Sequence, residues 1–347
     1  MKRILVVRND KIGDFMLAWP SFAMLKRSME CHVTALVPAY TAPLARLCPW
    51  IDEIILDPGA RADKEQQRAL LARIKAAAFD ASICLFSNTR NAKLVWKAHI
   101  PYRLAPATKL AQVLYNQRLV QRRSRSQKPE YEYNLDLVRR FLADQQLSVV
   151  EPQGPYLSFD PESLQQVREQ VASRLKLDAG RPWLMVHAGS GGSANNLSIE
   201  QYSRLIIKLN QACPELQCVL TAGPGEEGKA EQLAAELLAH GGNGWIYRSD
   251  EGLPKFCQVM ANAALFVAGS TGPLHIAAAL DVPTIGFFPA HRSATPLRWR
   301  PLNSEGRHLA FSPPEDSDHP EDMSQLDPKT MAAAIARWAP PFWRAES

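Results

Sequence analysis

Two glycine- and serine-rich stretches in the second half of the chain have the composition of an anion-binding turn. Residues 187–193 read His-Ala-Gly-Ser-Gly-Gly-Ser and follow a strand-like run at 183–186. Residues 269–275 read Gly-Ser-Thr-Gly-Pro-Leu-His and lie between an apolar run at 263–267 and a helix-like run at 276–280. Small residues at such a turn let the backbone approach a ligand, which the free N–H groups of the helix then face. Either stretch alone could be a plain tight turn with a core histidine, but the pair predicts one phosphate or diphosphate held by two loops.

A carboxylate in the first loop of the chain could act as a base. Residues 8–14 read Arg-Asn-Asp-Lys-Ile-Gly-Asp and follow a strand-like run at 4–7. Asp14 opens a helix, where an acid commonly caps the first turn. Alternatively, it could take the proton from an attacking sugar hydroxyl, with Arg8 and Lys11 binding an anionic acceptor nearby. The loop lacks Walker A spacing and the GxGxxG pattern, which disfavours a nicotinamide dinucleotide.

Strand-like and helix-like segments alternate along the whole chain. The first half predicts strands at 4–7, 32–37, 51–56 and 81–86, with helices at 15–26, 64–78, 93–98 and 131–146. After a proline-bearing linker at 151–160, the second half predicts strands at 184–186, 218–221, 245–247, 265–267 and 284–287. Its helices are predicted at 161–175, 198–212, 227–239, 253–263, 272–280 and 329–338. This alternation indicates an α/β protein of two Rossmann-like domains, residues 1–155 and 156–347, whose parallel sheets face an interdomain cleft. The terminal helix could pack back on the first domain.

Composition excludes several classes of protein. The apolar fraction of 46% and charged fraction of 22% are those of a globular protein, and no apolar run is long enough to cross a bilayer. The six cysteines are scattered and form no CxxC pair, which predicts reduced thiols. Charged residues at 8–14 come too early for a secretory signal, which predicts a cytoplasmic protein. The net charge of +5 is too small to indicate nucleic acid. Cations cluster at 118–128, which predicts either a solvated surface or one that meets anionic lipid or an acidic acceptor.

The order and spacing of several motifs are specific together. They are Gly13-Asp14, the stretch at 187–194, Ala-Gly-Pro-Gly-Glu-Glu at 222–227, the stretch at 270–280, Arg-Trp-Arg-Pro at 298–301, and Tyr-Asn-Leu-Asp-Leu at 133–137. With them the chain resembles, over nearly its whole length, the glycosyltransferase family that includes the bacterial lipopolysaccharide heptosyltransferases. That family has the GT-B fold. It transfers a sugar, typically a heptose, from an ADP-sugar to the lipopolysaccharide inner core, with inversion and without a metal.

The resemblance implies roles for individual residues. Asp14 would be the general base, and Glu226 or Glu227 would hold the ribose hydroxyls. The donor-binding set would comprise Ser190, Gly191, Gly192, Ser193, Asn195, Glu226, Glu227, Ser270, Thr271, Gly272 and His275. The acceptor, a lipid-linked anionic glycan, would meet Arg8, Lys11, Arg90, Lys93, Arg122 and Arg123. No cofactor is expected, and peripheral contact with the cytoplasmic face of the inner membrane would be compatible with such an acceptor.

The sequence departs from the family pattern at two places. Asn195 stands where many members have a lysine, and Ser270 where many have an acid associated with sugar hydroxyls. Arg292, Arg298 or Arg300 could replace the lost cation. The Asp-Ser-Asp-His run at 316–319 is similar to a metal motif, but its acidic, proline-bearing context predicts a solvated loop. Another donor, a protein or other glycan acceptor, a sugar-nucleotide 2-epimerase and a binding protein without catalysis therefore stay as alternatives.

Overall fold

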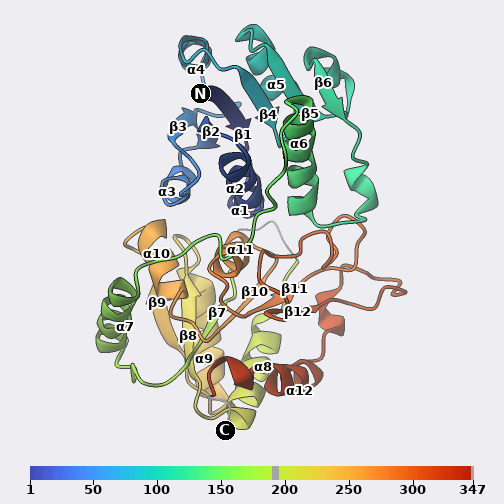
Figure 1. Ribbon diagram of the computed structural model, residues 1–347. Helices are drawn as coiled ribbons and strands as arrows, with labels where there is room; N and C mark the ends of the chain where they lie inside the picture. The colour runs from blue at the N-terminus through green and yellow to red at the C-terminus, as the bar shows by residue number, and fades with distance from the viewer. Residues whose placement is uncertain (190–194, 345–347) are drawn as a thin grey trace. The chain divides into compact units, whose positions relative to one another are not determined.

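The computed structural model describes residues 1–189 and 195–344, and the chain forms two compact units. Their boundary lies between Gln153 and Gly154, close to the boundary predicted between residues 155 and 156. Each unit contains one parallel six-stranded sheet with helices on both faces (Figure 1). The two predicted Rossmann-like domains are therefore present.

The first unit is built from β1 to β6 and α1 to α6. Its strands are β1 (Lys2–Val7), β2 (Cys31–Pro38), β3 (Glu53–Asp57), β4 (Ala81–Cys84), β5 (Tyr102–Pro106) and β6 (Gln117–Leu119). Its helices are α1 (Ile12–Met16), α2 (Trp19–Ser28), α3 (Ala42–Ala45), α4 (Lys64–Ala76), α5 (Thr89–Lys97) and α6 (Glu130–Asp144), with short 3₁₀ turns η1 (Leu110–Leu114) and η2 (Arg123–Arg125). The sheet order is β3-β2-β1-β4-β5-β6.

The central strands of this sheet are buried on both faces, so their sequences are apolar without alternation. On one face, Leu5 and Val7 of β1 pack with Ile74 of α4 and Val95 of α5. Successive strand residues point to opposite faces, so Ile4 and Val6 of β1 turn to the other side, where α2 lies beside α6. Because both of its faces are buried, the register of β1 is fixed. The loop that carries the candidate base, Asp14, begins where β1 ends.

The second unit repeats this plan. Its strands are β7 (Trp183–His187), β8 (Gln217–Ala222), β9 (Trp245–Arg248), β10 (Leu265–Gly269), β11 (Thr284–Phe287) and β12 (His308–Phe311), in the order β12-β11-β10-β7-β8-β9. Its helices are α7 (Pro161–Leu175), α8 (Ile199–Ala212), α9 (Glu227–Ala239), α10 (Leu253–Met260), α11 (Gly272–Ala279) and α12 (Pro328–Trp338), with 3₁₀ turns η3 (Met323–Gln325) and η4 (Pro340–Phe342).

Helices α8, α9 and α12 cover one face of this second sheet. Leu205 and Leu209 of α8, Leu233 of α9 and Ile335 of α12 share one apolar core with the strands. The predicted capping box is present at the start of α8, where Ser198 accepts a hydrogen bond from the Gln201 N–H. The sequence left open a return of the last helix to the first unit; in the structure α12 packs on α8 of its own unit.

Both sheets reverse their strand order at one point, and that point carries the predicted chemistry. In the first unit the order changes direction between β1 and β4, and in the second between β7 and β10. Adjacent crossovers diverge there and leave a crevice beyond the carboxyl ends of the strands, where α/β proteins bind ligands. The Asp14 loop follows β1, and the two glycine-rich stretches follow β7 and β10.

Some predicted elements differ from the observed ones for identifiable reasons. The helix expected at 15–26 is two helices, because Pro20 lies in the first turn of α2 and cannot donate into a continuous helix. Helix α5 starts at Thr89, earlier than expected, because the Asn88 side chain caps it by accepting from the Asn91 N–H. Strands β5, β6 and β12 were not predicted. No described helix is long and apolar enough to cross a membrane.

Candidate functional site

The carboxylate of Asp14 is held by a buried arginine. Asp14 lies in the first turn of α1, and its Oδ1 is 2.5 Å from Nη2 of Arg8 at the end of β1. Arg8 also approaches Asp10 (Nε to Oδ1, 2.9 Å) and Glu130 of α6 (Nη1 to Oε1, 3.4 Å). One guanidinium thus joins three carboxylates, and only Arg offers enough donors in a planar fork to do so. Asp14 keeps a side-chain exposure of 17%, which a base that must meet a substrate needs.

Burial and charge act against each other in this cluster. Burial by itself would lower the pKa of the Arg8 guanidinium, but Asp10, Asp14 and Glu130 together raise that pKa above its usual value. Burial raises the pKa of Asp10 to about 6, although Arg8 opposes the change. Arg8, predicted as an acceptor-binding residue, is 2% exposed, and this position suits orienting the loop carboxylates.

A second network anchors the same loop to the neighbouring strands. Asn9 donates through Nδ2 to Asp57 Oδ2 at 2.5 Å and exchanges amide hydrogen bonds with Asn91. Asp57, at the end of β3, accepts two hydrogen bonds from Arg90, at 2.8 and 2.6 Å. Burial would raise the pKa of Asp57, but the hydrogen bonds from Arg90, Gly59 and Asn9 lower it overall. The loop backbone before Asp14 is therefore fixed by side chains from β3 and α5.

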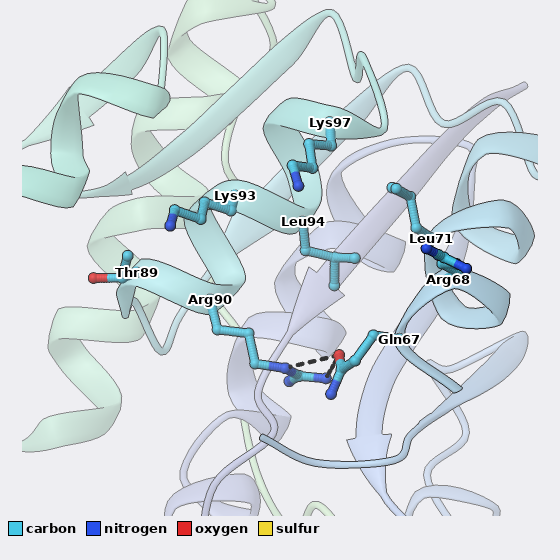
Figure 2. A pocket seen from close by; sticks show the side chains of 8 residues that line it. All are labelled: Gln67, Arg68, Leu71, Thr89, Arg90, Lys93, Leu94 and Lys97. Carbon is cyan, nitrogen blue, oxygen red and sulfur yellow. Dashed lines mark hydrogen bonds between the residues drawn. The ribbon is translucent and has the colours of Figure 1, made fainter. Parts of the chain in front are cut away.

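A cationic hollow lies between α4 and α5 in this unit (Figure 2). It has a volume of about 450 Å³ and is lined by Gln67, Arg68, Leu71, Thr89, Arg90, Lys93, Leu94 and Lys97. Figure 2 shows Arg90 beside Gln67, whose Oε1 accepts from its Nε and Nη2, and Lys93 and Lys97 extended from α5. Four of the eight lining residues are cations and none is acidic, so the hollow suits an anionic group.

In the second unit, Glu226 turns its carboxylate toward the corner after β7. Its Oε2 is 3.1 Å from Nε2 of His187 and accepts from the Gly223 N–H at 3.3 Å. The other ring nitrogen of His187 lies 3.0 Å from Thr221 Oγ1. A Cβ built on Gly189 would lie 2.4 Å from the Glu226 carboxylate, so only glycine leaves room for it there. Of the two candidates Glu226 and Glu227, it is thus Glu226 whose carboxylate is held beside the corner after β7.

The corner after β10 presents the uncapped start of α11. Thr271 is its N-cap residue, yet its side chain makes no capping hydrogen bond to the helix; its Oγ1 instead donates to Gly269 O at 3.3 Å. Ser270, Thr271 and Gly272 are half-buried. His275 is buried, and burial lowers its pKa to about 4. At neutral pH it is therefore a neutral imidazole that could donate a hydrogen bond but brings no positive charge.

The remaining predicted site residues are dispersed. Ser190, Gly191, Gly192 and Ser193 lie outside the described residues. Asn195 is exposed and donates to Glu321 O at 3.2 Å. Arg123 pairs with Glu130 at 2.6 Å and so belongs to the Arg8 cluster, whereas Arg122 and Lys11 are exposed.

Sequence reasoning missed several residues that the fold brings in. Glu130 lies 116 positions after Asp14, and no local pattern links them. Asp57 was not singled out, and His187 was noted only as the first residue of the glycine-rich stretch at 187–193. The spacing of Arg90, Lys93 and Lys97 on one helix was a usable signal, because residues three and four apart share a face. Within residues 1–189 and 195–344, no three His, Cys, Asp or Glu side chains cluster in a way that could hold a metal ion.

Comparisons with known proteins agree with this architecture. Residues 67–323 match the model of glycosyltransferase family 9 (heptosyltransferase). A Haemophilus influenzae protein named as a proposed glycosyltransferase is 49% identical over 347 residues, covering 99% of both chains. The glycosyltransferase family 9 structure from Veillonella parvula superposes with a TM-score of 0.79 at 16% identity, covering 98% of this chain and 97% of that one. The E. coli heptosyltransferase WaaC with ADP has a TM-score of 0.72 at 20% identity, covering 97% and 100%.

Proposed function

The chain belongs to glycosyltransferase family 9, the heptosyltransferase family, and on this premise we propose that it transfers a heptose or related sugar from an ADP-sugar to the lipopolysaccharide inner core. The observation that carries the proposal is the Arg8-held carboxylate of Asp14 at the switch point of the first sheet. The second unit binds the donor and the first unit binds the acceptor. The reaction takes place in the cytoplasm, on an acceptor anchored in the inner membrane.

The donor proposal rests on the two corners of the second sheet. The uncapped N-terminus of α11 offers backbone N–H groups and the positive end of its dipole to the diphosphate. Glu226, held by His187 and Gly223, accepts hydrogen bonds from the two ribose hydroxyls. The structure of E. coli WaaC was solved with ADP, which favours an adenine nucleotide for this chain as well.

The acceptor proposal rests on the hollow between α4 and α5. Arg68, Lys93 and Lys97 are exposed, and none lies within 4 Å of a carboxylate among the residues that the structure describes. Carboxylates and phosphates of an inner-core glycan would supply the missing counter-charge. Arg90, in contrast, already forms an ion pair with Asp57. It therefore contributes more to the shape of the hollow than to neutralising the charge of a ligand.

In the proposed reaction, Asp14 takes the proton from the acceptor hydroxyl as its oxygen attacks the anomeric carbon. The bond from that carbon to the nucleoside diphosphate breaks on the opposite side, so the configuration inverts. The leaving diphosphate gathers negative charge, which the α11 N-terminus stabilises without a metal ion. Arg8 keeps the Asp14 carboxylate oriented through its 2.5 Å contact.

The proposal is tested with the purified chain, ADP-heptose and a detergent-dispersed inner-core acceptor. We expect product of inverted configuration in the presence of EDTA, and ADP released in equal amount. Asp14→Asn should lower kcat by roughly 10²–10⁴-fold and leave the Kd of ADP unchanged, since a base acts only in the chemical step. Near-normal turnover by that variant would refute the base.

The same assay separates the alternatives. A 2-epimerase would convert a nucleotide sugar without any acceptor. A transferase with another donor would ignore ADP-heptose, and a thermal-shift screen across nucleotide sugars would identify that donor, because a ligand that binds only the folded state raises Tm. A protein or other glycan acceptor would leave the inner-core acceptor unmodified.

A further inference from the structure

The stretch between Asp80 and Glu130 differs in charge from the rest of the chain. It contains no Asp or Glu and ten Lys or Arg residues. Since the whole chain carries +5, the remainder carries −5. In the fold this stretch runs from β4 through α5, β5, η1, β6 and η2, which places its ten cations on the half of the first sheet that ends at β6 (Figure 1).

The same stretch exposes large apolar side chains. Leu110 is 89% exposed, Val113 71% and Val120 70%. Residues i and i+3 of a 3₁₀ helix lie on one face, so Leu110 and Val113 of η1 point to solvent together. Ala111 and Leu114 of the same turn pack against the apolar core. The turn is therefore anchored from beneath, and its outer face lacks a partner among the described residues.

Backbone pairing brings these side chains close to exposed cations. Strands β5 and β6 are parallel neighbours, and Ala107 N donates to Leu119 O at 2.8 Å just beyond them, next to Val120. Lys109, Arg118 and Arg125 are exposed on the same segments. None of these three has a carboxylate within 4 Å in the part of the chain that the structure describes.

We propose that η1 and the segment after β6 form a surface that binds an anionic lipid bilayer. Exposed aliphatic side chains enter the boundary between head groups and acyl chains, while surrounding cations attract anionic lipid. A surface for RNA would pair its cations with aromatic side chains for stacking, whereas Leu110, Val113 and Val120 are aliphatic. The inference deepens the proposed function and rests on it for its purpose, because the acceptor of that reaction is anchored in a membrane.

The test is vesicle flotation of the whole protein. We expect binding to vesicles of phosphatidylcholine with phosphatidylglycerol, and much weaker binding to phosphatidylcholine alone. The triple variant Lys109→Gln/Arg118→Gln/Arg125→Gln should lower the partition coefficient by about 100-fold, at about fivefold for each cation.

A second variant separates insertion from simple charge attraction. Leu110→Ser/Val113→Ser/Val120→Ser should lower the partition coefficient by at least about tenfold, since each large apolar side chain that is buried in the bilayer adds to the free energy of binding. The matched control is Leu238→Ser, which alters a 70% exposed leucine on α9 of the second unit and should bind as the wild type does. Circular dichroism and Tm confirm that each variant folds.

Four results would overturn the proposal. They are the absence of binding to anionic vesicles, equal binding to neutral and anionic vesicles, wild-type binding by the apolar variant, and tighter binding to RNA than to anionic vesicles in the same buffer. Transfer to a detergent-dispersed acceptor is measured in parallel. A protein that floats with vesicles but transfers no sugar would refute the proposed function alone. One that transfers sugar but does not float would refute the surface alone.

Discussion

Replacing Gly189 by Ala tests whether Glu226 is placed to bind the donor. The new Cβ would lie 2.4 Å from the Glu226 carboxylate, well inside van der Waals contact. The carboxylate must then leave its contacts with His187 Nε2 at 3.1 Å and the Gly223 N–H at 3.3 Å. If it also bonds the ribose, a lost hydrogen bond to a charged group is worth about 1.5–3 kcal/mol. We therefore expect the Kd of ADP to rise about 10- to 160-fold.

Isothermal titration calorimetry with ADP and 2′-deoxy-ADP measures this effect. The wild type should prefer ADP, and Gly189→Ala should lose most of that preference. Gly228→Ala is the matched control, because nothing lies within 4 Å of its added Cβ and it lies two residues from Glu226. In a Glu226→Ala background the clash is gone, so Gly189→Ala should have little further effect. An unchanged Kd for ADP in a folded Gly189→Ala protein would refute this placement of Glu226.

Three further outcomes follow from the buried contacts. Arg90→Met should destabilise the first unit by about 3 kcal/mol in urea unfolding, because it leaves the Asp57 carboxylate buried without its cation; equal stability would mean that Asp57 is solvated. Asp10 has a pKa raised by burial to about 6, so its contribution to stability falls as pH rises from about 4 to 6, by up to about 3 kcal/mol. When the free energy of unfolding is measured at pH 4.5 and at pH 7, the Asp10→Asn variant should not show that decrease. Gly269→Ala should lower Tm, because its Cβ would lie 2.8 Å from Asn196 Oδ1, which accepts from Leu197 N and Tyr202 OH; an unchanged Tm would mean that Asn196 moves at no cost.

The sequence predicted those parts of the fold that local patterns specify. The boundaries of α7 and α9 were predicted to the residue. At the start of α7 the local signal is plain, since Asp160 caps the helix and Pro161 is its first residue. Strands β5 and β6 were missed because each carries an arginine and lies in or beside a cation-rich run, which favours a loop assignment. Their pairing depends on β4 being next to β5, which only tertiary structure supplies.

The residues of the candidate site also fall into two groups, those with a local sequence signal and those that only tertiary contacts bring in. Asp14 and the glycine corners follow strands and carry their own local signal, so sequence reasoning could place them at strand ends, while their roles stay predictions. The partners of Asp14 are different: Arg8 was noticed as a neighbour, but its burial and its link to Glu130 come from α6, which is remote in the sequence. Likewise, the choice of Glu226 over Glu227 depends on the space left by Gly189, a contact across a turn that spacing does not reveal.

The link between Arg8 and Glu130 has a consequence for the order in which the protein matures. Loop 8–14 leaves the ribosome before α6, and a nascent chain that stops before residue 130 lacks both the α6 carboxylate and the packing of α6 on α2. Loop 8–14 therefore gains the last of its contacts only when α6 has emerged, although β3 and α5 already hold its backbone through Asn9. Fragments ending upstream of α6 should be inert and protease-sensitive, however complete their strands are.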